Sequence, residues 1–253
     1  MEWLDARRHG PAPLYLRFPD RRHWFAQLPD TRTVYARYRE VLDDEDETVA
    51  QFADRLSAYL REHAIERLVL DIRGNVGGNG FLNRPLIRTL VRAGPLWKPG
   101  GLFVLIDRGT FSAAVILAAE LERATPAIFV GEPTGGRPNG YGDSRRVRLP
   151  WTGLTVRVST LFWQLTNPRD RRDAITPHVT VSARFADYRE NRDPTLDTVL
   201  ALVRGLREPR GTWRGTLGVD HQRFAIEFRF RRTASTGTGD FSLPDAGVAR
   251  ERL

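Results

Sequence analysis

The stretch that decides the fold reads GLFVLIDRGTFSAAVILAAELER and runs from Gly101 to Arg123. Its apolar start, residues 102–106, has the length of a buried strand, and the alanine-rich run after Ser112 favours a helix. This order of strand, tight turn, serine and helix places a hydroxyl group at the positive end of a helix dipole. Free backbone N–H groups there stabilise an oxyanion, so Ser112 is a candidate nucleophile. The simpler interpretation is that Thr110 or Ser112 only caps the helix, which is the commoner case for such a stretch alone.

Two further segments combine an expected strand with a glycine-rich turn. Residues 68–72 are apolar and lead into RGNVGGNG at 73–80, and residues 127–130 lead into GEPTGGRPNGYG at 131–142. Glycines let a backbone turn sharply or approach another group closely. The first segment lacks the Gly-Lys-Ser/Thr ending of a phosphate loop. The second is a long Gly/Pro loop of the kind that lines a binding site.

The rest of the chain alternates between strand and helix patterns, which predicts an α/β fold. An amphipathic helix is expected from Val49 to about His63 and others at 85–91 and 195–203. Strands are expected at 14–18, 33–38, 147–149, 154–158 and 179–181. After Gly205 the pattern changes to period two, with phenylalanines alternating in 223–231. We therefore expect a core domain in residues 1–204 and a small, truncated β-rich module in residues 205–253.

Composition narrows the functional classes. The chain has 253 residues, a net charge of +8 and no cysteine, which excludes disulfides, thiolate metal sites and a cysteine nucleophile. Its only lysine is Lys98, and its many arginines are dispersed, which argues against nucleic acid as a partner. We expect no metal site, because the histidines are few and isolated. No membrane-spanning run or signal peptide is recognisable, and the sequence does not indicate a cellular location.

Three short segments together resemble a known family. They are LDIRGNVGG at 70–78, GTFSAA at 109–114 and GEPTGG at 131–136. Their order and spacing resemble the serine peptidases of the C-terminal processing (tail-specific) and tricorn-core type. Tyr15–Arg17 and Ile175–Pro177 fit the flanking strands of the same family, so the resemblance covers about residues 13–204.

This resemblance implies a Clp protease/crotonase-like core of coiled βαβ units and a serine-type peptidase that needs no cofactor. It implies Ser112 as the nucleophile that forms an acyl-enzyme with a peptide or protein substrate. It implies an oxyanion hole made of the backbone N–H of Ala113 and that of Gly77 or Gly78. The glycine-rich loop is expected to contact the substrate through Thr134, Gly135, Gly136 and Arg137.

The general base of this family is missing from its usual places. The processing proteases carry a lysine about twenty-five residues after the serine, where this chain has Arg137 or a neighbour, and arginine does not release its proton. The tricorn type has a histidine on the first strand, where this chain has Arg17. His23 and His178 are the substitute candidates, although a histidine beside aromatic residues usually has a structural role.

Three hypotheses follow. The first is a serine peptidase acting through Ser112. The second is a catalytically inactive member of the same family that binds a peptide or a partner through the same groove. The third is a crotonase-like acyl-CoA enzyme, which the serine at the helix start disfavours, because crotonases rely on an oxyanion hole and carboxylates.

Overall fold

The computed structural model of the chain describes residues 10–29, 31–207, 211–219, 222–232, 237–243 and 248–252. They form two compact units that divide between Val199 and Leu200. Within the described residues, no helix is long and apolar enough to cross a membrane.

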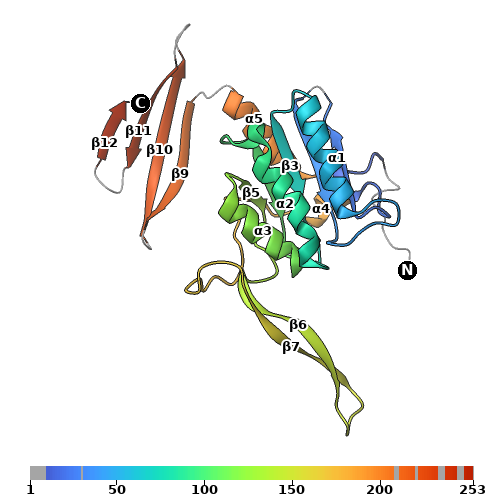
Figure 1. The fold of residues 1–253 in the computed structure, drawn as a ribbon. Helices are drawn as coiled ribbons and strands as arrows, with labels where there is room; N and C mark the ends of the chain where they lie inside the picture. The colour runs from blue at the N-terminus through green and yellow to red at the C-terminus, as the bar shows by residue number, and fades with distance from the viewer. Residues whose placement is uncertain are drawn as a thin grey trace. The chain divides into compact units, whose positions relative to one another are not determined.

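The first unit is built on a mixed, mostly parallel sheet with the strand order β1-β2-β3-β4-β5-β8 (Figure 1). Only β1 runs antiparallel to its neighbour. Every residue of β2, β3 and β4 is buried, as expected for parallel strands covered on both faces. The strands are β1 (His23–Gln27), β2 (Thr33–Tyr38), β3 (Arg67–Asp71), β4 (Leu102–Ile106), β5 (Ile128–Gly131) and β8 (Val179–Thr180).

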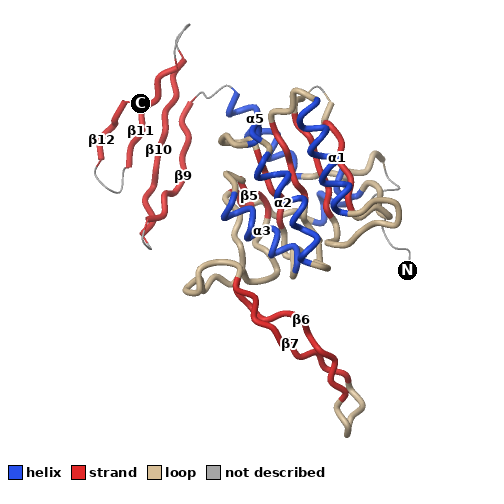
Figure 2. The backbone as a smooth tube through the Cα atoms, in the orientation of Figure 1, coloured by secondary structure: helices blue, strands red, loops and turns tan. Residues whose placement is uncertain are grey.

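Three helices pack on one face of this sheet (Figure 2): α1 (Val49–Glu62), α2 (Asn83–Arg92) and α3 (Ala113–Ala124). The first helix begins where its sequence predicts, because Thr48 and Gln51 form a reciprocal capping box. The apolar sides of these helices form one core with side chains of β2, β3 and β4. The remaining helical elements are the 3₁₀ turns η2 (Leu14–Leu16), η3 (Gly80–Leu82) and η4 (Gly94–Leu96), the short helix α4 (Phe185–Arg189) and the helix α5 (Pro194–Arg207).

A two-stranded ribbon leaves the first unit after β5. Its strands, β6 (Asn139–Arg148) and β7 (Thr155–Gln164), pair with each other and with no other described strand. The expected short strands at 147–149 and 154–158 are thus the outer part of a longer hairpin. Nearly all of the ribbon's side chains are exposed, and it extends away from the sheet (Figure 1).

The second unit contains an antiparallel sheet with the order β12-β11-β10-β9. The expected β-rich module at the C-terminus is therefore a four-stranded sheet, whose phenylalanine-rich strand is β10. The period-two pattern also predicts that the phenylalanine face of this module is half-buried, and those side chains lie outside the described part of the structure. The strands are β9 (Gly211–Val219), β10 (Gln222–Arg232), β11 (Gly237–Leu243) and β12 (Val248–Arg252).

The α/β class is confirmed, but the strand expected at residues 14–18 is wrong. Residues 14–16 form a 3₁₀ turn instead, in which Leu16 N–H donates to Pro13 and Arg17 N–H donates to Leu14. These local bonds satisfy the backbone without a neighbouring strand. The first strand is the aromatic segment that begins at His23, where Trp24 packs against Tyr35.

Candidate active site

The candidate site is formed by two turns at one edge of the sheet. Residues 74–78 follow β3, and residues 107–112 follow β4. Because β3 and β4 are parallel neighbours, their carboxyl ends lie side by side. Ligand sites of parallel sheets commonly lie at this edge.

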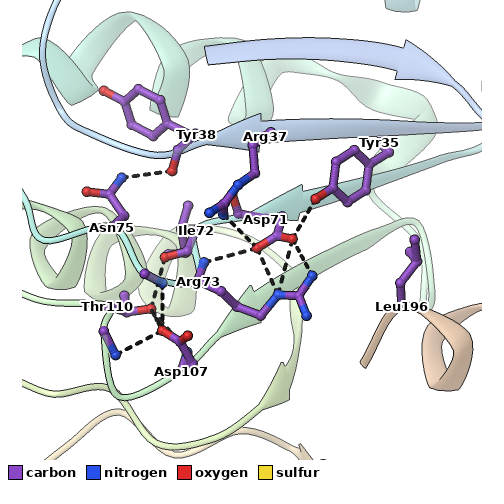
Figure 3. Close-up of polar contacts among 12 residues, drawn as sticks. Tyr35, Arg37, Tyr38, Asp71, Ile72, Arg73, Asn75, Asp107, Thr110 and Leu196 are labelled. Carbon is purple, nitrogen blue, oxygen red and sulfur yellow. Dashed lines mark hydrogen bonds and ion pairs between the residues drawn. The ribbon is translucent and has the colours of Figure 1, made fainter. Parts of the chain in front are cut away.

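Asp107 ties the two turns together (Figure 3). Its Oδ1 accepts hydrogen bonds from the backbone N–H of Gly74 at 2.7 Å and of Gly109 at 2.9 Å. Thr110 adds a second link, because its hydroxyl donates to the carbonyl of Ile72 at 3.0 Å. The hydroxyl of Thr110 thus links the segments that follow β3 and β4, and it does not cap α3.

Asn75 fixes the glycine turn from within the protein and is fully buried. Its side-chain amide donates to the carbonyl of Tyr38 at 2.9 Å, and its Oδ1 accepts the N–H of Gly77 at 2.9 Å. Its backbone carbonyl accepts the N–H of Phe111 at 2.9 Å. Asn75 therefore holds both turns in register with β2.

Ser112 stands at the start of α3 in a strained conformation. Its φ of 53° and ψ of −123° lie in a region that residues other than glycine rarely adopt, at a cost of about 1–3 kcal/mol. Its side chain is exposed and makes no capping hydrogen bond, while its carbonyl accepts from Val115 and Ile116. The helix-cap interpretation is therefore wrong for Ser112, because its hydroxyl accepts no hydrogen bond from the first turn of α3.

The backbone N–H groups near Ser112 differ in whether they already donate a hydrogen bond within the protein. The N–H of Gly77 is used by Asn75, whereas those of Gly78 and Ala113 donate to no described residue. Gly77 lies against the serine, because a Cβ on it would be 2.7 Å from Ser112 Cβ and 2.8 Å from Ala113 N. Gly78 and Ala113 line the same cavity as Ser112, so of the two glycines Gly78 is the one whose N–H is not used by another described residue.

A cavity of about 840 Å³ opens onto this serine. Gly78, Ser112 and Ala113 line it together with Gly135, Gly136 and Arg137 of the third motif. Thr134 does not line it: its buried hydroxyl donates to Gly136 and accepts from Ile175 N–H, so it shapes the loop from behind. The lining residues that the sequence analysis did not single out are mostly apolar or aromatic: Phe81, Phe111, Ile116, Tyr141, Trp163 and Leu165.

The two histidine candidates lie elsewhere. His23 is 1% exposed on β1 and borders a separate cavity with Phe18, Asp44 and Glu47. Burial lowers the pKa of His23, and its ring packs on Phe52 with centroids 4.8 Å apart. His178 accepts a hydrogen bond from Phe129 N–H at the edge of the sheet. Neither imidazole lines the cavity of Ser112, because His23 lies on β1 and His178 directly precedes β8, and these are the two edge strands of the sheet.

Arg17 and Arg137, which stand at the positions of the family's general base, do not replace the two histidine candidates. Arg17 is exposed and donates to the carbonyl of Ala12. Arg137 lines the cavity, where it pairs with Asp173 at 2.6 Å. Lys98 lies exposed in the turn before β4. Within the described residues, no histidine or lysine lines the cavity of Ser112.

A buried charge cluster supports the glycine turn from the other face of the sheet (Figure 3). Asp71, at the end of β3, is fully buried and accepts from Tyr35 Oη at 2.6 Å, Arg37 Nη1 at 3.0 Å and Arg73 Nε at 3.0 Å. Arg73 continues to Asp193, whose carboxylate also caps α5 by accepting Leu196 N–H. This cluster fixes the backbone just before Gly74. The role of this cluster was not predicted from the sequence, although an aspartate inside an apolar strand signals a buried partner.

Comparisons with known proteins support the resemblance. Residues 88–181 match peptidase family S41. No curated protein matches the chain. Among solved structures, a candidate peptidase from Parabacteroides merdae ATCC 43184 is similar in fold, with 18% identity, a TM-score of 0.55, and coverage of 72% of this chain and 64% of that one.

Two structures with lower TM-scores also match. The photosystem II D1 C-terminal processing protease is 21% identical over 64% of this chain and 48% of its own, with a TM-score of 0.45. The tricorn protease is 18% identical over 70% of this chain and 18% of its own, with a TM-score of 0.46. This chain thus spans less than two thirds of each of these three structures. The chain thus resembles the C-terminal processing and tricorn-type serine peptidases, and its residues 88–181, which carry Ser112, match peptidase family S41.

Proposed function

We propose that this chain is the core of a serine-type peptidase in which Ser112 is the nucleophile. The observation that carries the proposal is the strained, exposed Ser112 at the amino end of α3, in a cavity that is also lined by Gly78 and Ala113, whose N–H groups donate to no described residue. A serine on a strained strand-to-helix turn presents its Oγ to a substrate. The alternation of parallel strands and helices around it agrees with a Clp protease/crotonase-like core.

In this proposal Ser112 Oγ attacks the carbonyl carbon of a peptide bond. The Oγ–C bond forms while the hydroxyl proton passes to a base, and the leaving amine takes up a proton as the C–N bond breaks. Water then hydrolyses the acyl-enzyme. The carbonyl oxygen carries a negative charge in the tetrahedral intermediate and accepts hydrogen bonds from the N–H groups of Gly78 and Ala113. The positive end of the α3 dipole stabilises the same charge.

The substrate would lie in the cavity as a peptide. Gly135, Gly136 and Arg137 form one wall, held in place by Thr134 and by the hydrogen bond from Gly135 N–H to Thr110. Aromatic side chains supply much of the remaining lining, which suits the apolar side chains of a peptide.

A second candidate function is peptide binding without hydrolysis. The observation that favours it is the cavity lining, in which Arg137, Tyr141, Asp143 and Asp173 are the ionisable side chains of the described residues. Arg137 pairs with Asp173, and Asp143 accepts a hydrogen bond from Trp163 Nε1. A serine without a base is a poor nucleophile, so this lining suits a binding groove.

The substitution Gly77→Ala tests the proposed oxyanion site. The new Cβ would collide with Ser112 Cβ and Ala113 N, so peptide hydrolysis is expected to fall about 10²–10³-fold, as when an oxyanion donor is lost. Gly74→Ala is the matched control, because Gly74 also has a positive φ, of 64°, but has nothing within 4 Å of its added Cβ. Equal rates for the two variants would contradict the proposed placement of the oxyanion.

His23→Phe tests whether His23 is the base. Its two ring nitrogens make no hydrogen bond to described residues, and Nε2 is 3.6 Å from Glu47. Phenylalanine keeps the ring packing on Phe52 and removes buried, unsatisfied polar atoms. We expect unchanged hydrolysis and an equal or higher thermal midpoint. A loss of about 10⁴-fold in a folded variant would instead identify His23 as the base.

A further inference from the structure

The outer part of the β6–β7 ribbon, residues 144–159, is amphipathic. Directly paired residues share a face, and successive pairs alternate between faces. One face carries the pairs Val147–Val156 and Arg145–Val158, and the opposite face carries the pairs Arg146–Arg157 and Arg148–Thr155. The hydrogen bond from Leu149 N–H to Leu154 closes the turn at the tip.

The apolar side chains of this outer ribbon are exposed. Trp151 at the tip is 96% exposed and Leu154 is 63% exposed, and Val147, Val156 and Val158 are exposed as well. A lone two-stranded ribbon is marginal in water, and contiguous apolar surface on a soluble chain marks an interaction site. The feature is independent of Ser112, because the tip does not line the cavity.

Charge identifies the kind of partner. The sixteen residues 144–159 contain four arginines and no aspartate or glutamate. None of the four forms an ion pair with a described carboxylate. A second copy of the chain would bring two sets of arginines together, and the whole chain already carries +8. The partner must therefore be anionic and must also accept aliphatic and indole side chains. The arginines are Arg145, Arg146, Arg148 and Arg157.

The order of residues along the ribbon fits a lipid surface approached by the tip. Counted from the tip inward, the first large side chains are Leu149, Trp151 and Leu154. The four arginines follow on both strands. At about 3.3 Å per residue, Arg146 lies about 10 Å behind Leu149, which matches the depth of the headgroup layer above the acyl boundary. Tryptophan favours that boundary, and arginine favours lipid phosphates. Nucleic acid would pair with the arginines but would leave the valines and leucines in water.

We propose that the outer ribbon docks this protein on an anionic lipid surface, with its tip in the interface and its arginines on the phosphates. The docking is peripheral and reversible, because the tip is small and no lipid chain is involved.

Flotation of the full-length chain with vesicles tests this proposal. We expect binding to equimolar phosphatidylglycerol and phosphatidylcholine, weak binding to phosphatidylcholine alone, and release at high salt. Removing charge with R146Q and R157Q is expected to lower partitioning about thirtyfold, at about 1 kcal/mol for each arginine. The tip variant, W151S with L154S, is expected to lose at least about tenfold.

The matched control combines F185S with R88Q, which removes an exposed aromatic and an exposed arginine outside the ribbon. It is expected to bind vesicles like the native chain, and circular dichroism verifies that every variant is folded. Equal binding to neutral vesicles, or no effect of the ribbon variants, overturns the proposal. So does a dimer in light scattering that W151S dissociates, which assigns the ribbon to a second copy, or binding to duplex DNA without binding to vesicles.

Discussion

Ser112→Ala is expected to lower kcat/KM for peptide hydrolysis by at least about 10⁴-fold, because the substitution removes the only atom that forms the acyl-enzyme. The residual rate would come from the two amides and from substrate binding. The measurement is cleavage of a peptide library followed by mass spectrometry, with the native chain and the variant at equal concentration. Alanine introduces no new polar group at the start of α3, so the change in rate reports the loss of the hydroxyl alone.

Peptide binding separates the two candidate functions. Ser112→Ala leaves the cavity walls unchanged, so peptides that the native chain cleaves should bind the variant with similar Kd. If the native chain binds peptides, cleaves none, and is unaffected by the loss of the hydroxyl, the binding function is the correct one. Cleavage that persists undiminished in the variant would contradict Ser112 as the nucleophile.

Asp71→Ala is expected to lower the free energy of unfolding of the first unit by about 3–5 kcal/mol. The substitution leaves Arg37 and Arg73 buried without their shared carboxylate, and breaking a buried pair from one side is costly. Since Arg73 leads directly into the glycine turn, we also expect slower peptide hydrolysis. Urea unfolding followed by circular dichroism measures the stability effect.

Tyr35→Phe is the matched control for Asp71. It removes one hydrogen bond to the same carboxylate and keeps the charges, so a smaller cost of about 1.5–3 kcal/mol is expected. Equal costs for the two variants would show that the charge cluster adds nothing beyond that one bond.

The same cluster predicts an acid-dependent stability. Burial by itself would raise the pKa of Asp71, but Arg73 and Arg37 outweigh it and lower this pKa from 3.8 to about 2. A carboxylate whose pKa is lower in the folded state stabilises the fold at every pH above its pKa in the unfolded chain. This contribution is lost as the pH falls from 3.8 through about 2. The Asp71→Ala variant should therefore lose less stability over this interval than the native chain.

Local patterns were enough to predict most of the sheet and its helices. The apolar run at 102–106 is a strand with those bounds, and the amphipathic spacing after Thr48 is α1. Both are determined by period and capping, which are local properties of the sequence. The error at residues 14–18 has the same origin, because an apolar run shows no sign of whether a neighbouring strand is there to pair with it.

The site was predictable only in part. Glycines after a strand and a serine before a helix indicated where the two turns would meet, because both follow neighbouring parallel strands. The hydrogen bonds that hold these turns in place were not predictable, because they join residues that are far apart in the sequence. Asp107 and Gly74 are 33 positions apart, and Arg73 and Asp193 are 120 positions apart. The separation of His23 from Ser112 follows from the strand order, which places β1 at one edge and β4 in the interior.

The most direct test of the central claim is labelling of the folded, full-length chain with a fluorophosphonate probe, with the modified residue mapped by mass spectrometry. An activated serine becomes covalently phosphonylated, whereas a helix-capping or solvent serine does not. We expect one adduct, on Ser112, that is absent in Ser112→Ala and strongly reduced in Gly77→Ala. A native chain that is folded and remains unlabelled, or an adduct on another serine, would contradict it.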